Sequence, residues 1–209
     1  MHKRFVMVSA AALALAAASH TATAQMAAPK PTFGVLGGLN VAKVSGDNVT
    51  GVSNRTGFNA GLFLTMHMNS AWSIEPEALY SQQGADASGA TLKMNYLEVP
   101  VLLRWDVMSK APVHPFFIAG PAAALQVGCS ASSGSQSMSC DQLNQSSPGS
   151  FQKKSFDMLG VAGAGVGFSF GATQMSLGAR YAYGFSNALT VDGTDLKNRY
   201  FSVLLGLTF

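Results

Sequence analysis

Apolar and polar residues alternate along most of the chain with a period of two. In the segment 58–68, Leu62 and Met66 lie on one side of an extended backbone, and Asn59 and Thr65 lie on the other. Alternation over about ten residues is typical of a strand that crosses a membrane as part of a β-barrel. The pattern predicts eight such strands, at residues 33–44, 58–68, 72–83, 94–106, 115–127, 155–170, 174–185 and 199–209.

The connections between these segments alternate between long and short. The long connections are residues 45–57, 84–93, 128–154 and 186–198, and the short ones are residues 69–71, 107–114 and 171–173. Outer-membrane barrels have long loops outside and tight turns on the periplasmic side. We therefore predict an all-β protein, an eight-stranded antiparallel up-and-down transmembrane β-barrel. Because the segment 115–127 is apolar on both sides, its facing stays open.

Aromatic residues on the apolar side of the predicted strands form two groups. The group near the periplasmic ends is Trp72, Trp105, Phe170 and Phe209. The group near the opposite ends is Phe58, Tyr80, Phe156, Tyr183, Phe185 and Phe201. Two such bands are expected where lipid headgroups meet hydrocarbon, whereas a soluble sheet has no reason to form them.

Three prolines conflict with a fully paired sheet. Pro76, Pro100 and Pro121 each remove a backbone hydrogen-bond donor from a predicted strand. We expect β-bulges at these positions to accommodate them.

The first residues resemble an export signal. Lys3 and Arg4 precede an uncharged apolar run at residues 5–18, and residues 22–24 form a small-x-small cleavage motif. The apolar run is shorter than the roughly 20 residues of a transmembrane helix. We predict a cleaved signal peptide at residues 1–24, a short periplasmic tail at 25–32 and a barrel domain at 33–209.

Charge and composition narrow the class of protein further. Charged residues make up 11% of the chain and hydrophobic residues 48%, which excludes an intrinsically disordered protein. Two of the 13 Lys+Arg and none of the 10 Asp+Glu lie in residues 1–24, so the remaining chain has 11 basic and 10 acidic residues. A nucleic-acid partner needs a basic surface and is not expected. The predicted location is the outer membrane of a Gram-negative bacterium, with membrane lipid as the main partner.

Three motifs resemble the small outer-membrane β-barrels of the PorT type, often called porin-family proteins. They are GVLGGLN at residues 34–40, EALYSQQG at 77–84 and YLEVPVLL at 96–103. The resemblance covers most of residues 33–209 and is least clear at 128–154. It implies an OmpA-like, eight-stranded barrel, and it includes Pro100. Since most members of this family are uncharacterised, it implies little about function, although the namesake is tied to protein secretion across the outer membrane.

Six charged residues fall on the inward side of the predicted strands. Eight strands enclose an interior that side chains just fill, and a buried charge needs a partner of opposite sign. With the third and fourth strands antiparallel, Glu75 and Arg104 lie near a diagonal and within reach of each other. The cluster either braces the barrel as a charged plug or gates a narrow path for ions. Its members are Glu75, Glu77, Glu98, Arg104, Asp157 and Arg180.

Catalytic signatures are weak. The glycine-rich residues 160–167 alternate within a predicted strand and lack the lysine and following helix of a phosphate loop, so we expect these inward glycines to make room in the lumen. A hydrolase needs a base beside its nucleophile, but His67 and His114, the only histidines after residue 24, both fall at the periplasmic end. We predict a protein that is not an enzyme and has no cofactor and no metal.

Cys129 and Cys140 are the only cysteines, and both lie in the long connection 128–154. In an exported protein such a local pair favours a disulfide. Closing this short loop contributes about 2–3 kcal/mol in the chain-entropy model. A metal site would need further ligands, and Asp141 is the one nearby candidate.

The last predicted strand carries a signal of its own. It alternates apolar residues and ends on an aromatic residue, like the signature read by the barrel assembly machinery, which we expect to be a partner during biogenesis. The residues are Phe201, Val203, Leu205, Leu207 and Phe209.

Three functional hypotheses follow from these patterns. The first is a barrel with a filled lumen that has a structural role or displays loops to an envelope or extracellular protein. The second is a narrow porin-like channel for ions or small solutes. The third, which rests on the family resemblance alone, is an accessory of protein secretion.

Overall fold

The computed structural model describes most of the predicted barrel domain. The described residues are 30–45, 52–87, 89–134, 136–140, 142, 151–153, 156–171, 173–185, 189–191 and 194–209. The predicted signal peptide, residues 25–29 of the predicted tail, and parts of all four long connections, including Asp141, lie outside them. Within the described ranges, no helix is both long and apolar enough to cross a membrane.

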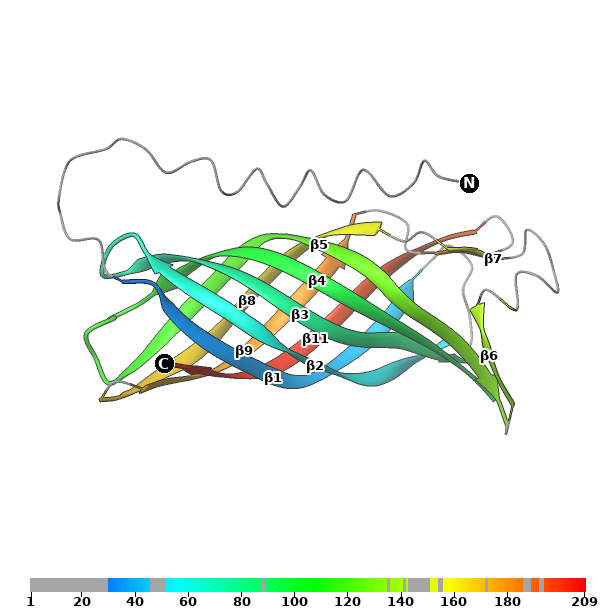
Figure 1. Cartoon of the computed structure of the whole chain (residues 1–209), viewed down its shortest axis with the longest axis horizontal. Helices are drawn as coiled ribbons and strands as arrows, with labels where there is room; N and C mark the ends of the chain where they lie inside the picture. The colour runs from blue at the N-terminus through cyan, green and yellow to red at the C-terminus, as the bar shows by residue number, and fades with distance from the viewer. Residues whose placement is uncertain are drawn as a thin grey trace, which may run out of the picture.

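Eight antiparallel strands close into a barrel (Figure 1). Each strand pairs with the next along the chain, and β1 pairs with β11 to close the ring, with Gly34 opposite Thr208. This confirms the predicted fold. The strands are β1 (Thr32–Ser45), β2 (Val52–His67), β3 (Trp72–Ala87), β4 (Ala90–Asp106), β5 (Val113–Ser133), β8 (Phe156–Phe170), β9 (Thr173–Gly184) and β11 (Thr194–Thr208).

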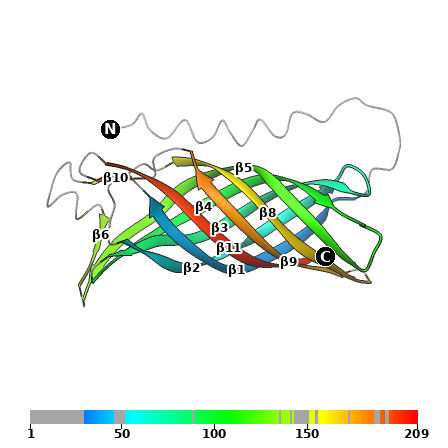
Figure 2. The same ribbon diagram turned by 180° about the vertical axis from the view of Figure 1, so that it is seen from behind.

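The two ends of the barrel differ. β1 begins and β11 ends at the same end, which also carries the short connections 68–71 and 107–112 and the turn at Gly171 (Figures 1 and 2). We call it the short-turn end. At the other, long-hairpin end lie three short strands, β6 (Gln136–Ser139), β7 (Phe151–Lys153) and β10 (Leu189–Val191). The sequence pattern did not predict these three strands.

The structure settles the facing of β5, which the sequence left open. His114, Phe116 and Ile118 point into the lumen and are at most 6% exposed, whereas Phe117 and Leu125 lie on the outer surface and are nearly half exposed. Because both of its faces contact apolar surroundings, this strand has no hydrophilic face to reveal its orientation. The packed interior of the barrel provides the second apolar environment.

Inward glycines make room for large side chains in the lumen, as the sequence predicts. A Cβ atom at Gly165 would overlap the ring of Phe116, and one at Gly167 would lie 2.5 Å from the imidazole of His114. The interior therefore resembles the core of a soluble protein. Its buried apolar residues form two clusters, one of them made of Leu36, Phe63, Leu79 and Leu204.

Aromatic residues on the outer surface form bands at both ends of the barrel. At the short-turn end Trp72 stacks on Trp105, with 5.7 Å between ring centroids, and at the other end Phe58 lies 5.8 Å from Tyr80. Trp72 and Tyr80 are eight positions apart on β3. At about 3.3 Å per residue and a tilt of about 40°, this separates the bands by roughly 20 Å, close to the apolar height of an outer-membrane barrel.

The strands extend further into the long connections than predicted. The connection 84–93 is not a loop, because β3 continues to Ala87 and β4 begins at Ala90. Likewise β5 runs on to Ser133 and turns into β6, with Gly134 at a φ of 58° in the turn. Such turns need residues that tolerate positive φ. The result is two hairpins, β3–β4 and β5–β6, that continue the barrel wall at the long-hairpin end (Figure 1).

The expectation of β-bulges at the three prolines is wrong. Pro76 stays paired with Val101, Pro100 with Ala122 and Pro121 with Gly160, and the ladder gaps that follow Pro76 and Pro100 keep the register. The register shifts lie elsewhere, between Asn54 and Asn59 on β2 and between Asn95 and Tyr96 on β4. The barrel therefore tolerates a missing donor without shifting the strand register.

Candidate functional site

The candidate site is the lumen, which contains all six predicted charges. The four acids are at most 4% exposed, and the side chains of both arginines are 12% exposed. They come from four strands: Glu75 and Glu77 from β3, Glu98 and Arg104 from β4, Asp157 from β8 and Arg180 from β9. We call these six residues the lumen charge cluster.

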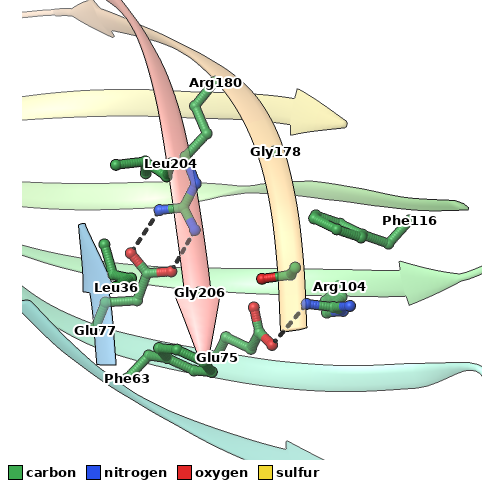
Figure 3. A pocket seen from close by; sticks show the side chains of 11 residues that line it. Leu36, Phe63, Glu75, Glu77, Arg104, Phe116, Gly178, Arg180, Leu204 and Gly206 are labelled. Carbon is green, nitrogen blue, oxygen red and sulfur yellow. Dashed lines mark hydrogen bonds and ion pairs between the residues drawn. The ribbon is translucent and has the colours of Figure 1, made fainter. Parts of the chain in front are cut away.

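Near the short-turn end, Arg104 contacts two carboxylates. Its guanidinium donates to Asp106 at 2.8–3.0 Å and to Glu75 Oε1 at 3.3 Å. The guanidinium also lies 4.0 Å from the ring centroid of Phe116. Glu75 accepts a further hydrogen bond from Thr65 at 3.0 Å. The predicted diagonal contact between Glu75 and Arg104 is thus confirmed (Figure 3).

The sequence pattern did not identify Asp106 as part of this group. It is the last residue of β4, and it lies two positions from Arg104, on the same face of the strand. The imidazole of His114 lies beside it, with 3.3 Å between His114 Nε2 and Asp106 Oδ1 and 3.2 Å between Nδ1 and the carbonyl oxygen of Ala111. Because Asp106 lies two positions from Arg104, alternation places it on the inward face. A charged residue at the end of a strand is, however, typical of the barrel rim, so the sequence does not mark it as a lumen residue.

A fork-to-fork ion pair crosses the middle of the lumen. Arg180 on β9 donates to both oxygens of Glu77 on β3, at 2.6 and 2.8 Å (Figure 3). Such bidentate pairs are the strongest ion-pair geometry that proteins use. Gly163 gives the arginine space, since a Cβ there would lie 3.1 Å from Arg180 Cγ.

Toward the long-hairpin end, Glu98 is held by neutral groups. It accepts hydrogen bonds from the Tyr200 hydroxyl at 2.5 Å and from Gln83 Nε2 at 2.6 Å. Gln83 Nε2 is also 2.9 Å from Ser81 Oγ. Among the described residues, no cation forms an ion pair with Glu98. The sequence pattern identifies Glu98 but neither of its donors.

Little space remains between these side chains. The cavity lined by the four charged residues Glu75, Glu77, Arg104 and Arg180 has a volume of about 20 Å³. A single water molecule needs at least about 10–15 Å³ on the same measure. A larger cavity of about 190 Å³ lies at the short-turn mouth, beside Asp106 and His114. Among the described residues, no group of three or more His, Cys, Asp or Glu could hold a metal ion.

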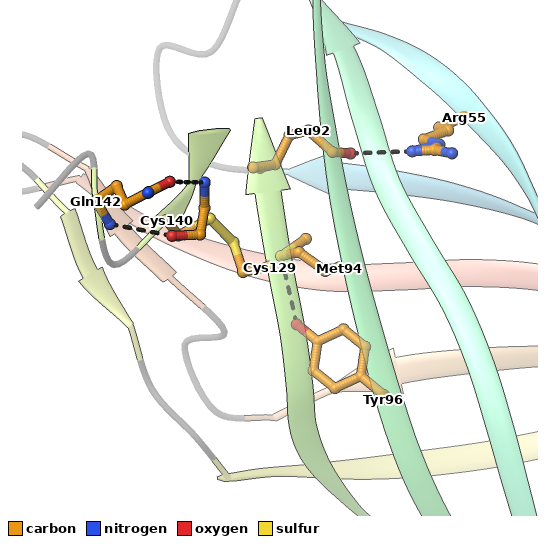
Figure 4. The surroundings of a disulfide bond; sticks show 8 residues. Arg55, Leu92, Met94, Tyr96, Cys129, Cys140 and Gln142 are labelled. Atoms are coloured by element: carbon orange, nitrogen blue, oxygen red, sulfur yellow. Dashed lines mark hydrogen bonds between the residues drawn. A yellow bond between two sulfur atoms is a disulfide. The ribbon is translucent and has the colours of Figure 1, made fainter. Parts of the chain in front are cut away.

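The two cysteines form a disulfide at the long-hairpin end. Cys129 on β5 and Cys140 just after β6 have Cα atoms 5.4 Å apart (Figure 4). The pairing of Ser130 with Ser139 places the disulfide at the base of the β5–β6 hairpin. It links two neighbouring segments of the barrel extension, and Cys140 is only 6% exposed.

The predicted assembly residues lie on the outer surface of β11 and, for Phe209, directly after it. Phe201, Val203, Leu205 and Phe209 are 45–67% exposed, and Leu207 pairs with Val35 of β1. The backbone N–H of Phe209 donates to the carbonyl of Phe33 at 2.8 Å, so Phe209 takes part in closing the barrel. Recognition of this strand by the assembly machinery stays a prediction.

Comparison with solved structures places the fold among small outer-membrane barrels. Neisserial surface protein A shares 15% identity with the chain at a TM-score of 0.53, covering 87% of this chain and 100% of that one. Ail, the attachment invasion locus protein of Yersinia pestis, gives 17% identity and a TM-score of 0.47, covering 87% and 100%. OprG from Pseudomonas aeruginosa gives 13% and 0.49, covering 85% and 95%. At these identities the likeness concerns the fold alone.

The sequence itself matches a family over most of its length. No curated protein sequence matches the chain. The family model for the outer membrane protein beta-barrel domain matches residues 24–190. The matched region covers all the strands from β1 to β9 and therefore most of the closed barrel. The chain belongs to the outer membrane protein beta-barrel domain family.

Proposed function

We propose that this outer-membrane protein is a non-enzymatic barrel with a closed lumen, which presents its long hairpins to a protein partner outside the cell. The observation that carries the proposal is the filled interior. Long hairpins on the outside match the usual orientation of such barrels.

The closed lumen is supported by the ion pairs and by the small central cavity. Glu77 and Arg180 come from strands on different parts of the wall and meet in the middle. With about 20 Å³ left beside them, a hydrated ion could pass only if this pair separated. The two apolar clusters fill the surrounding space. These contacts favour a bracing role for the lumen charge cluster over a conducting role.

Two features support a role without catalysis. Both ring nitrogens of His114 already lie beside oxygen atoms, those of Ala111 and Asp106, and neither of these is the hydroxyl of a nucleophile. In the part of the chain that the structure describes, no serine is hydrogen-bonded to either His67 or His114.

The hairpin end supports a display role. β3, β4, β5 and β6 continue as one sheet beyond the aromatic band, and a disulfide fixes the base of the last hairpin. A sheet held by backbone ladders and a disulfide presents its surface with little loss of conformational entropy on binding. This is a rigid platform, in contrast to a flexible loop.

Planar-bilayer recording tests the closed lumen. We expect the purified protein to show no steady single-channel conductance. The double variant E77A/R180A removes both halves of the central ion pair and serves as the matched control, for which we expect small conductance steps. Steady conductance of the unchanged protein would support the channel hypothesis and overturn ours.

A pull-down from envelope extracts tests the display role. The bait is the full-length barrel, compared with a variant in which residues 130–139 are replaced by a two-residue turn. We expect a partner to be lost with the hairpin and retained when the short-turn residue Lys110 is changed to Gln. Equal recovery with both baits would contradict hairpin-mediated binding.

The narrower predictions about biogenesis belong to the same proposal. Export by a cleaved signal peptide at residues 1–24 predicts that the protein isolated from membranes begins at Gln25, which N-terminal sequencing checks. Recognition of the last strand predicts that deleting Phe209 lowers the outer-membrane yield. Membership of the PorT type, and with it a link to secretion, is supported by the three sequence motifs alone.

A further inference from the structure

Arg199 lies on the outer surface of the barrel, where arginine is unusual. On β11, Tyr200 and Ser202 point into the lumen and are at most 5% exposed, while Phe201 is 48% exposed and points outward. By alternation, Arg199 also points outward. It lies two residues beyond Phe201, toward the long-hairpin end, and so at the level of the lipid headgroups.

An aromatic residue holds Arg199 in place. Arg199 pairs across the sheet with Tyr183 on β9, and its guanidinium carbon lies 4.8 Å from the centroid of the Tyr183 ring. That ring in turn contacts Phe185 edge-on, with 5.7 Å between centroids. The guanidinium is therefore stacked on the aromatic band that marks this edge of the membrane.

Arg199 has no anionic partner among the described residues. Arg104 and Arg180 each bind a carboxylate, but no ion pair includes Arg199. Its Nε atom is buried and lacks a hydrogen-bond acceptor. A guanidinium at the border of the hydrocarbon is costly without a counter-charge, and the residues that the structure describes do not provide one.

We propose that Arg199 and Tyr183 form a binding site for the phosphate of an anionic lipid in the outer leaflet. The guanidinium provides a fork of donors that fits phosphate, and its stacking on Tyr183 orients that fork. The tails of the lipid would cover the exposed apolar surface below, which includes Phe201 and Val203. The inference rests on the proposed orientation, with the long-hairpin end outside.

Native mass spectrometry of the full-length protein in neutral detergent tests this site. The probes are phosphatidylglycerol and, as the zwitterionic control, phosphatidylcholine. We expect R199Q to weaken phosphatidylglycerol binding by about fivefold, the effect of one charge at a headgroup, and to leave phosphatidylcholine binding unchanged. K110Q removes an exposed cation at the opposite end and should bind both lipids as the unchanged protein does.

Two further variants distinguish a lipid site from a general effect of charge. Y183L keeps every charge and removes the stacking partner, so it should also weaken phosphatidylglycerol binding. R199K keeps the charge and loses the fork of hydrogen-bond donors. If R199Q does not fold, R199K and Y183L together test the site. The heat-dependent gel shift of folded barrels shows which variants are folded.

The outcomes that contradict the site are specific. Equal phosphatidylglycerol binding by folded R199Q and the unchanged protein would overturn the proposal. A loss in K110Q as large as that in R199Q would do the same, because it would show that any cation on the barrel has this effect. Displacement of the lipid by inorganic phosphate alone would show that a free anion is the ligand. Failure of this test leaves the closed lumen and the hairpin display untouched, since their experiments use other residues.

Discussion

Two buried carboxylates in the lumen are stabilised in different ways. Glu77 is 4% exposed and faces the guanidinium of Arg180, which donates two hydrogen bonds to it. Glu98 is fully buried and accepts hydrogen bonds from Tyr200 and Gln83, neither of which carries a charge. The barrel thus contains an ion pair at its centre and a neutral network nearer the long-hairpin end.

The difference shows how an eight-stranded barrel can fill its interior. An ion pair holds two opposite walls together, but removing either partner leaves the other as an unpaired buried charge, which destabilises the barrel. A carboxyl group held by two neutral donors gains less from each contact and loses less when one is removed, because the other donor remains in place. We therefore expect substitutions at the two sites to differ in magnitude.

The largest effect is expected for Arg180→Met, which leaves Glu77 buried without its cation. Breaking a buried ion pair in this way typically costs about 3–5 kcal/mol. Urea unfolding of the refolded protein in lipid vesicles measures the loss through the fluorescence of Trp72 and Trp105. The double variant E77M/R180M is the control, since removing both charges should recover most of the loss. A double variant as unstable as R180M would show that packing, rather than charge, is responsible.

The next effect compares two identical substitutions. Glu77→Gln leaves Arg180 with a neutral acceptor, and we expect a loss of about 2–3 kcal/mol, in the upper part of the range for hydrogen bonds to a charged group. Glu98→Gln keeps the size and most of the polar contacts, and it should change the unfolding free energy by less than about 1 kcal/mol. The same urea titrations give both values. Equal losses would mean that Glu98 depends on a charge partner as Glu77 does.

The sequence predicts which lumen residues are charged but not which of them meet. Strict alternation shows that Glu77 and Arg180 both face inward. It does not show their height along the barrel axis, which depends on the tilt and stagger of the strands. Because these two residues are 103 positions apart in the chain, no local pattern links them. Tyr200 escapes prediction for a related reason, because a tyrosine near the membrane border is typical of the outer aromatic bands.

The ends of the strands and the positions of bulges were less predictable from the sequence than the side of the barrel wall that each residue faces. The segment 84–93 contains glycine and several small residues, which favoured a loop, yet both strands continue through it because each pairs with a neighbour that also continues. Conversely, prolines suggested bulges that do not form, since an antiparallel ladder can omit a hydrogen bond and keep its register. Neighbouring strands decide these features, and a single segment does not reveal them.

A smaller effect is expected for Tyr200→Phe, which removes one donor from Glu98 and keeps the ring. The hydroxyl makes a short hydrogen bond to Oε2, at 2.5 Å, and its loss should cost about 1.5–3 kcal/mol if the carboxyl is charged. Combining Y200F with E98Q tests whether the Tyr200 hydroxyl acts through Glu98 or through other residues. If the two losses add, the hydroxyl stabilises the barrel through contacts to residues besides Glu98. A strong departure from additivity would confirm that it acts on Glu98.

Of the two donor substitutions, the smaller effect is expected for Gln83→Met, which replaces the second donor with an apolar side chain of similar length. Gln83 Nε2 divides its hydrogens between Glu98 and Ser81, and the net loss for a neutral hydrogen bond is about 0.5–1.5 kcal/mol. Methionine can fill the vacated volume, so little cavity cost is added. In the urea titration, Q83M should therefore lose less than Y200F does. A loss as large as that of R180M would mean that the neutral network matters to the fold as much as the ion pair does.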